Sequence, residues 1–182
     1  MADLWPVPSR LTELRALPVR VKPNWRGFAA KFVGAVMWLG ELLRVRAATR
    51  ALDQYIQVIG GTIYAPRGSD GELGKSIRRH ESTHDFQQRT RGKVRYVLGY
   101  FNPFSAKYRQ HAEAQAYAVE VATGGRSLDG AADSASDPIY ALRWERSDAL
   151  SLISDYTKKW TKECRGVAEA RKAFLSADSS KP

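Results

Sequence analysis

Two of the three histidines in this chain stand four residues apart, with a glutamate directly after the first, in the order His80-Glu81-Ser82-Thr83-His84. On an α-helix, residues four apart lie on one face, so both imidazoles can bind the same metal ion. The glutamate then stands beside the open coordination position, where it can take a proton from water. This spacing predicts a zinc site of the peptidase type, with His80 and His84 as ligands and Glu81 as general base.

A catalytic zinc normally takes three protein ligands, so one more His, Cys or carboxylate is expected downstream. The candidates are His111 and Glu113, which lie about 200° apart around a helix, so at most one of them can face the metal. Periodicity slightly favours His111, which borders an apolar stripe. Glu113 has Ala116 and Tyr117 one turn on, which could form a second apolar face. The residues alone leave both candidates open.

Amide hydrolysis also needs a donor for the developing oxyanion. No histidine follows His111, so this donor must be a tyrosine, an arginine or a backbone N–H. The tyrosines to consider are Tyr96, Tyr100, Tyr108 and Tyr140, each of which could equally be a packing residue.

The elements around the motif can be read from turn and cap signals. Residues 57–65 (QVIGGTIYA) are β-branched and aromatic around a Gly pair, which predicts a strand or hairpin. Ser69 and Glu72 fit a capping box, and Gly92 follows two arginines, which predicts a helix over about 70–91. An apolar stripe of this helix continues into the motif through Leu73, Ile77, His80 and His84.

Helical patterns also precede and follow this region. Residues 28–55 read as a helix with a break near Gly40. Residues 94–101 (VRYVLGYF) suit a short strand or a lid segment. Asn102 and Pro103 predict the start of a further helix, which the glycines at 124 and 125 end. The alanines at 112, 114, 116, 118 and 122 would let another helix approach this one closely.

The remaining segments are assigned by composition. Residues 127–137 (SLDGAADSASD) are small and polar, which predicts a surface loop. Residues 138–159 suit a final amphipathic helix, and residues 177–182 a disordered tail. Residues 1–26, rich in Pro and Arg, suit an extended basic arm lying over the domain or over a neighbour, ahead of a single domain over 27–176.

Composition limits the classes of protein that remain. With 182 residues, of which 43% are hydrophobic, the chain suits one globular domain, and its single cysteine excludes an intrachain disulfide. We find no secretory signal, and the most apolar run, residues 32–39, is short of the roughly 20 residues that cross a bilayer. We therefore expect a protein without a transmembrane helix, either cytoplasmic or associated with a virion or injection particle.

The net charge of +10 is unevenly spread along the chain. Residues 1–110 hold 19 Lys and Arg against 8 Asp and Glu, whereas residues 111–182 hold 10 against 11. A basic N-terminal part suits contact with an anionic surface such as lipid, nucleic acid, cell-wall polymer or an acidic partner. The sequence contains no specific nucleic-acid motif.

The run from Gly60 to Gln88, followed by the segment EAQAY that begins at Glu113, resembles small gluzincin-type zinc metallopeptidases. It is most similar to the compact zinc-peptidase-like domain of bacterial toxin and contractile-injection-system proteins. The resemblance implies a strand beside the HExxH helix, a bound Zn²⁺, Glu81 as the catalytic base and Glu113 as the third ligand. Two positions depart from the pattern of this family. The first is Gln115, which stands where an acidic residue is common. Tyr117 stands where thermolysin-like enzymes carry an Asp that orients a ligand histidine.

The combined expectation is an α+β fold, a mostly helical zincin-like domain with a small sheet or hairpin next to the HExxH helix. Its function would be zinc-dependent hydrolysis of a peptide or amide bond in a peptide, protein or cell-wall substrate. The alternative is a structural component of a phage or injection-type assembly that retains a zinc-peptidase fold, with or without activity. In that case the N-terminal arm and the apolar helix would dock into partner chains.

Overall fold

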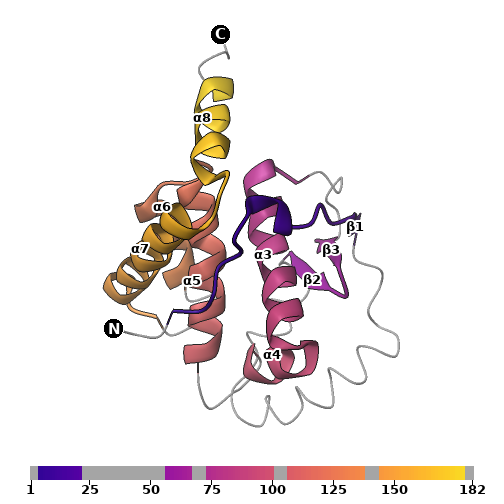
Figure 1. Ribbon diagram of the computed structural model, residues 1–182. Coiled ribbons are helices and arrows are strands. Elements are labelled where there is room, and N and C mark those ends of the chain that lie inside the picture. Colours follow the sequence, from indigo (N-terminus) through magenta and orange to yellow (C-terminus); the bar gives the residue numbers. More distant parts are fainter. Residues whose placement is uncertain (1–3, 22–55, 67–72, 101–105, 138–143, 179–182) are drawn as a thin grey trace.

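A computed structural model describes residues 4–21, 56–66, 73–100, 106–137 and 144–178 of the chain. This part is mostly helical with one small sheet, which confirms the predicted α+β class. The helices are α3 (Lys75–Arg91), α4 (Lys93–Tyr100), α5 (Lys107–Ala122), α6 (Leu128–Ser136), α7 (Arg146–Glu163) and α8 (Val167–Asp178). Figure 1 shows α5 between α3 on one side and α7 on the other, with the sheet beside α3.

The sheet has three strands in the order β1-β3-β2. The strands β2 (Gln57–Ile59) and β3 (Thr62–Ala65) pair antiparallel, and β1 (Val19–Val21) pairs parallel with β3. The glycines at 60 and 61, which join β2 to β3, have φ values of 60° and 79°. A two-residue hairpin turn of type I′ needs positive φ at both positions, which is the conformation that glycine adopts without strain. The hairpin predicted over 57–65 is confirmed.

The motif helix α3 begins at Lys75, after Gly74, and ends at Gly92 with a φ of 83°. The end agrees with the prediction, since the left-handed conformation at Gly92 stops the helix. The start is about five residues later than predicted. Gly74 caps the helix without a side-chain hydrogen bond, and the proposed Ser69 and Glu72 capping box lies outside the described residues.

The segment after Gly92 is the helix α4, so the short strand that was one of the two predictions for 94–101 is wrong, while the lid segment stays a prediction. The apolar residues of α4 alternate in sequence, but its aromatic rings follow a helical spacing. Tyr96 and Tyr100, four residues apart, both face α3, and their rings stack with centroids 5.5 Å apart. This contact favours a helix over a strand. Val94 and Leu98 remain exposed on the outer side.

The helix α5 is the centre of the described fold, in contact with α3, α4, α6, α7 and α8. Its alanines are buried, which lets neighbouring helices approach closely as predicted. The helix ends at Thr123 and is followed by Gly124 with a φ of 81°, as expected from the glycine pair. The predicted start at Asn102 and Pro103 lies outside the described residues.

The segment 127–137 is not a loop but the helix α6. Ser127 caps it by accepting a hydrogen bond from the N–H of Gly130 (3.1 Å). On its inner side Ala131, Ala132 and Ala135 are fully buried. The small residues that suggested a loop instead allow close packing against α5 and α7.

The predicted helix over 138–159 corresponds to α7, which begins later, at Arg146 after the extended Glu145, and extends to Glu163. It is not the final helix, because α8 follows after a short turn and includes positions 177 and 178 of the expected disordered tail. The predicted helix over 28–55, with its apolar run 32–39, lies outside the described residues, as do residues 138–143. Within the described part, no helix is both long and apolar enough to cross a membrane.

Residues 4–21 of the basic arm pack on their own chain, and Figure 1 shows this indigo segment running from the side of α7 to α3 and the sheet. The N–H of Trp5 donates a hydrogen bond to the hydroxyl of Tyr156 in α7 (2.9 Å). Farther along, Ser82 in α3 donates to the carbonyl of Arg15 (2.8 Å). The arm therefore joins the two sides of the domain.

Candidate metal centre

The structure brings His80, His84 and Glu113 together between α3 and α5. The two Nε2 atoms are 3.2 Å apart, and the Glu113 carboxylate oxygens lie 3.4 Å from Nε2 of His80 and 3.5 Å from that of His84. All three side chains are buried. Tetrahedral zinc with bonds of about 2.0–2.1 Å separates its ligand atoms by about 3.3 Å. The three groups are thus spaced as the ligands of one small cation would be.

His111, the other candidate, faces away from this cluster. Its Nδ1 lies 3.0 Å from the hydroxyl of Tyr156, and its ring stacks on Trp5 of the arm with centroids 5.8 Å apart. Periodicity favoured His111 because this residue borders an apolar stripe of α5. That stripe packs against the arm and α7, so His111 does not face His80 and His84. Glu113 lies on the side of α5 that faces α3.

His80 is held in place by Glu120, two helical turns after Glu113. Nδ1 of His80 donates a hydrogen bond to Oε1 of Glu120 (2.7 Å). The second oxygen of Glu120 accepts from Ser76 (2.8 Å) and pairs with Nε of Arg126 (3.3 Å). Burial raises the pKa of Glu120, but His80 and Arg126 lower it more, so this carboxylate is ionised.

His84 is held by a chain of amides that ends at the arm. The side-chain nitrogen of Gln115 donates to the carbonyl of Pro6 (2.7 Å), so its oxygen is free to accept from Nε2 of Gln87 (2.8 Å). That leaves Oε1 of Gln87 as the acceptor, 3.0 Å from Nδ1 of His84. The Pro6 carbonyl sets the orientation of the Gln115 amide, which in turn sets that of Gln87. Because Oε1 of Gln87 can only accept, Nδ1 of His84 must carry the proton.

With both Nδ1 atoms acting as donors, the Nε2 lone pairs of the two histidines point at each other and at a carboxylate. These two nitrogens and the two carboxylate oxygens, all electron-rich, repel one another unless a positive charge, carried by a metal ion or a proton, lies among them. Two neutral imidazoles and one carboxylate are a common donor set for catalytic zinc. The residues present therefore fit a Zn²⁺ ion.

The pKa values of His80 and Glu113 also indicate that this cluster requires a positive charge. Burial lowers the pKa of His80, but hydrogen bonds and charge interactions with Glu113 and Glu120 raise it well above its ordinary value. Burial raises the pKa of Glu113, but the two histidines and Tyr100 bring it down to about 2. Without a metal, a proton on His80 supplies the positive charge that the carboxylates require.

Glu81, the predicted base, stands between His80 and His84 in the sequence, and its side chain is buried. Burial raises its pKa, and the negative charges of Glu113 and Glu120 raise it further, whereas His80 and His84 act in the opposite direction. A raised pKa makes a carboxylate a stronger base than an exposed glutamate, which is the direction that a proton acceptor requires.

Two of the four candidate tyrosines border the cluster. The hydroxyl of Tyr100 donates to Oε1 of Glu113, and that of Tyr96 lies 3.1 Å from Nδ1 of His84. Burial raises the pKa of both phenols well above the ordinary value, so both stay neutral. Tyr100 is a donor, whereas the oxygen of Tyr96 can only accept from the proton on Nδ1 of His84. The ring of Tyr108 instead packs on that of Trp5, with the two ring centroids 4.6 Å apart. Tyr140 lies outside the described residues.

The sequence interpretation missed Glu120 and Gln87 as supports of the two histidines. For Glu120 a signal was present, since residues seven apart return to the same face of a helix and Glu120 is seven after Glu113. The second carboxylate was expected at position 117, where Tyr117 instead places its ring edge-on against His80 at 4.7 Å. The Gln87 amide chain could not be found from spacing, because it depends on Pro6, which is distant in sequence.

Comparison of the chain with protein-family models, curated proteins and solved structures gave no match. The resemblance to gluzincin-type peptidases therefore stays a prediction from the motif, and the proposed function rests on the geometry of the site.

Proposed function

We propose that this protein is a zinc-dependent hydrolase of peptide or amide bonds, of the metallopeptidase type. The observation that carries the proposal is the convergence of two Nε2 lone pairs and the Glu113 carboxylate at distances of 3.2–3.5 Å. Glu81 of the same helix turn is buried and has a raised pKa. This combination of ligands and base is the one that peptide hydrolysis at zinc requires.

The roles of the residues follow from their contacts. His80, His84 and Glu113 would hold the ion, which when bound supplies the Lewis acidity that makes water nucleophilic near neutral pH. Glu81 would accept the proton from the attacking water and later pass it to the leaving amine. Glu120 and Gln87 keep the ligand imidazoles in the tautomer that presents Nε2.

The neutral hydroxyl of Tyr100 is the donor that we assign to the developing oxyanion. It comes from α4 and already donates to a carboxylate oxygen of Glu113 within the cluster. A neutral phenol can move this hydrogen bond to a new oxyanion without giving up its proton.

The proposal is tested by metal content and hydrolysis together. The purified protein should carry one zinc ion per chain, and His80→Ala and Glu113→Ala should lose it. Glu81→Gln should keep the zinc, but its hydrolysis of unfolded protein substrates should fall by about 10²–10⁴-fold. His111→Ala serves as the control and should keep the zinc. A protein that does not take up zinc, or a fully active Glu81→Gln variant, would rule the proposal out.

The alternative, a structural component of a phage or injection-type assembly, drew on the arm and on the apolar helix over 28–55 as docking segments, and that helix lies outside the described residues. Residues 4–21 instead contact α3, α5 and α7 of their own chain. This part of the arm therefore offers no support for a partner protein, and the hydrolase remains the function that the geometry favours.

A further inference from the structure

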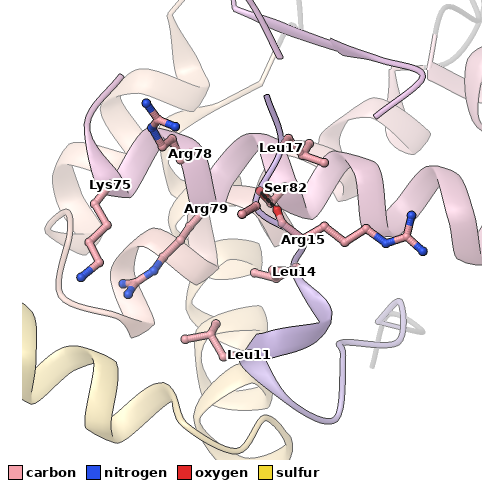
Figure 2. A pocket seen from close by; sticks show the side chains of 9 residues that line it. Leu11, Leu14, Arg15, Leu17, Lys75, Arg78, Arg79 and Ser82 are labelled. Carbon is pink, nitrogen blue, oxygen red and sulfur yellow. Dashed lines mark hydrogen bonds between the residues drawn. The ribbon is translucent and has the colours of Figure 1, made fainter. Parts of the chain in front are cut away.

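A pocket of about 200 Å³ lies between the arm and α3 (Figure 2). Its lining residues of α3, such as Lys75 and Arg79, fall on a different face of the helix from His84 by the 3.6-residue period. Leucines 11, 14 and 17 of the arm form its apolar wall. The wall from α3 is cationic and includes Lys75 and Arg79. Among the described residues, no acidic side chain lines the pocket, so the walls that the structure describes are positively charged.

Arg79 is the most unusual group of this pocket. Its Nη1 atom is buried and has no hydrogen-bond partner, and no described acidic residue pairs with it. The rest of the side chain is only half-buried, so the cost falls on this one N–H group, which has lost water without gaining an acceptor. In Figure 2 its guanidinium and the ammonium of Lys75 point to the same side of α3. Arg78, by contrast, turns back to the carbonyl of Leu73 (3.0 Å).

The start of α3 adds to this positive charge. The first N–H groups of a helix lack partners within the helix and form the positive end of its dipole, where acidic residues are normally favourable. The first turn of α3 has no acidic residue, and Gly74 offers no side-chain cap. Lys75, the first residue of α3, is therefore placed where a cation destabilises the helix unless an anion offsets it, and Arg79 lies one turn further on.

We propose that this pocket binds a phosphate group carried on a short apolar moiety. A doubly charged phosphate matches two cations and accepts several hydrogen bonds from a guanidinium. The leucine wall suits a few methylene groups. The volume is below the roughly 300 Å³ of sites for drug-sized ligands, so the ligand is small.

The test measures binding of inorganic phosphate and of butyl phosphate by titration calorimetry, in sodium chloride of matched ionic strength. Butyl phosphate should bind several-fold more tightly than phosphate. Arg79→Gln should weaken both at least about tenfold, while Arg95→Gln, an exposed change of equal charge on α4, should have no effect. Lys75→Gln is a second variant at an exposed position, which should fold normally and also weaken binding.

Three outcomes would overturn the proposal. Binding that Arg79→Gln and Arg95→Gln alter equally, or not at all, would be non-specific. Binding that survives in Arg79→Gln but is lost in Glu113→Ala would lie at the metal centre. Binding only to vesicles that contain phosphatidic acid, with none to butyl phosphate, would mean a membrane surface rather than a small ligand.

Discussion

At the scale of single residues, the candidate centre depends on groups that do not touch the metal position. Glu120 accepts the Nδ1 proton of His80, and Gln87 accepts that of His84. Such supports commonly contribute 10–100-fold to metal affinity, because they fix the tautomer and raise the basicity of the ligand.

Glu120→Gln should therefore weaken zinc binding by about tenfold or more, since the amide still accepts the proton but no longer carries the charge. Competition with a chromophoric chelator measures the affinity, and circular dichroism checks the fold. Glu169→Gln, at an exposed position of α8, is the matched control. Equal affinities in the two variants would remove Glu120 from the site.

The pH dependence of metal binding follows from His80. Its pKa is raised in the metal-free protein, so below that value zinc must displace a proton, whereas Glu113, with a pKa of about 2, stays ionised. Zinc affinity should therefore rise with pH, by up to about tenfold per unit, until the pH passes the raised pKa. Chelator competition between about pH 6 and pH 8 measures this slope. A flat profile would mean that His80 holds no proton for zinc to displace.

At the scale of elements, the sequence predicted best what is decided locally. The hairpin at residues 57–65 and the helix ends at Gly92 and Gly124 were correct, because positive φ at glycine determines each turn. The strand suggested for 94–101 was wrong because the helical spacing of Tyr96 and Tyr100, whose rings stack in α4, was not considered. The helix α6 was misread because buried alanines look the same in sequence as the small residues of a loop.

The alanine contacts of α5 can be tested directly. Ala118 is fully buried in the core, so Ala118→Leu should lower the free energy of unfolding by about 1–3 kcal/mol through overpacking. Ala168→Leu, exposed on α8, should change it by less than about 0.5 kcal/mol. Urea unfolding gives both values. If the Ala118 variant is as stable as the control, α5 is not packed this tightly.

At the scale of the whole molecule, the arm connects distant parts of the fold. Trp5 is buried against Tyr108, and the guanidinium of Arg91 lies 3.7 Å from its ring centroid. The neighbouring Pro6 carbonyl starts the amide chain that ends at His84. The arm thus contributes to stability and to the orientation of a candidate ligand.

Trp5→Ala should lower the free energy of unfolding by about 3–5 kcal/mol, as for other large-to-small core changes. Zinc affinity should fall as well, because the displaced arm no longer orients Gln115. Leu175→Ala, at a side chain that is 53% exposed, is the control and should alter neither quantity appreciably. Thermal unfolding and chelator competition measure the two effects. Loss of stability with unchanged zinc affinity would separate the arm from the metal centre.

The sequence by itself determined that His80 and His84 share one helix face with Glu81 between them, since that depends only on the 3.6-residue period. It also reduced the third ligand to His111 or Glu113. The tertiary structure decided which of these two side chains lies beside His80 and His84, and it also decided the contacts of Glu120 and Gln87 and the path of the arm. Periodicity relates residues within one helix, but which face of α5 meets α3 depends on how the arm, α6 and α7 pack around it.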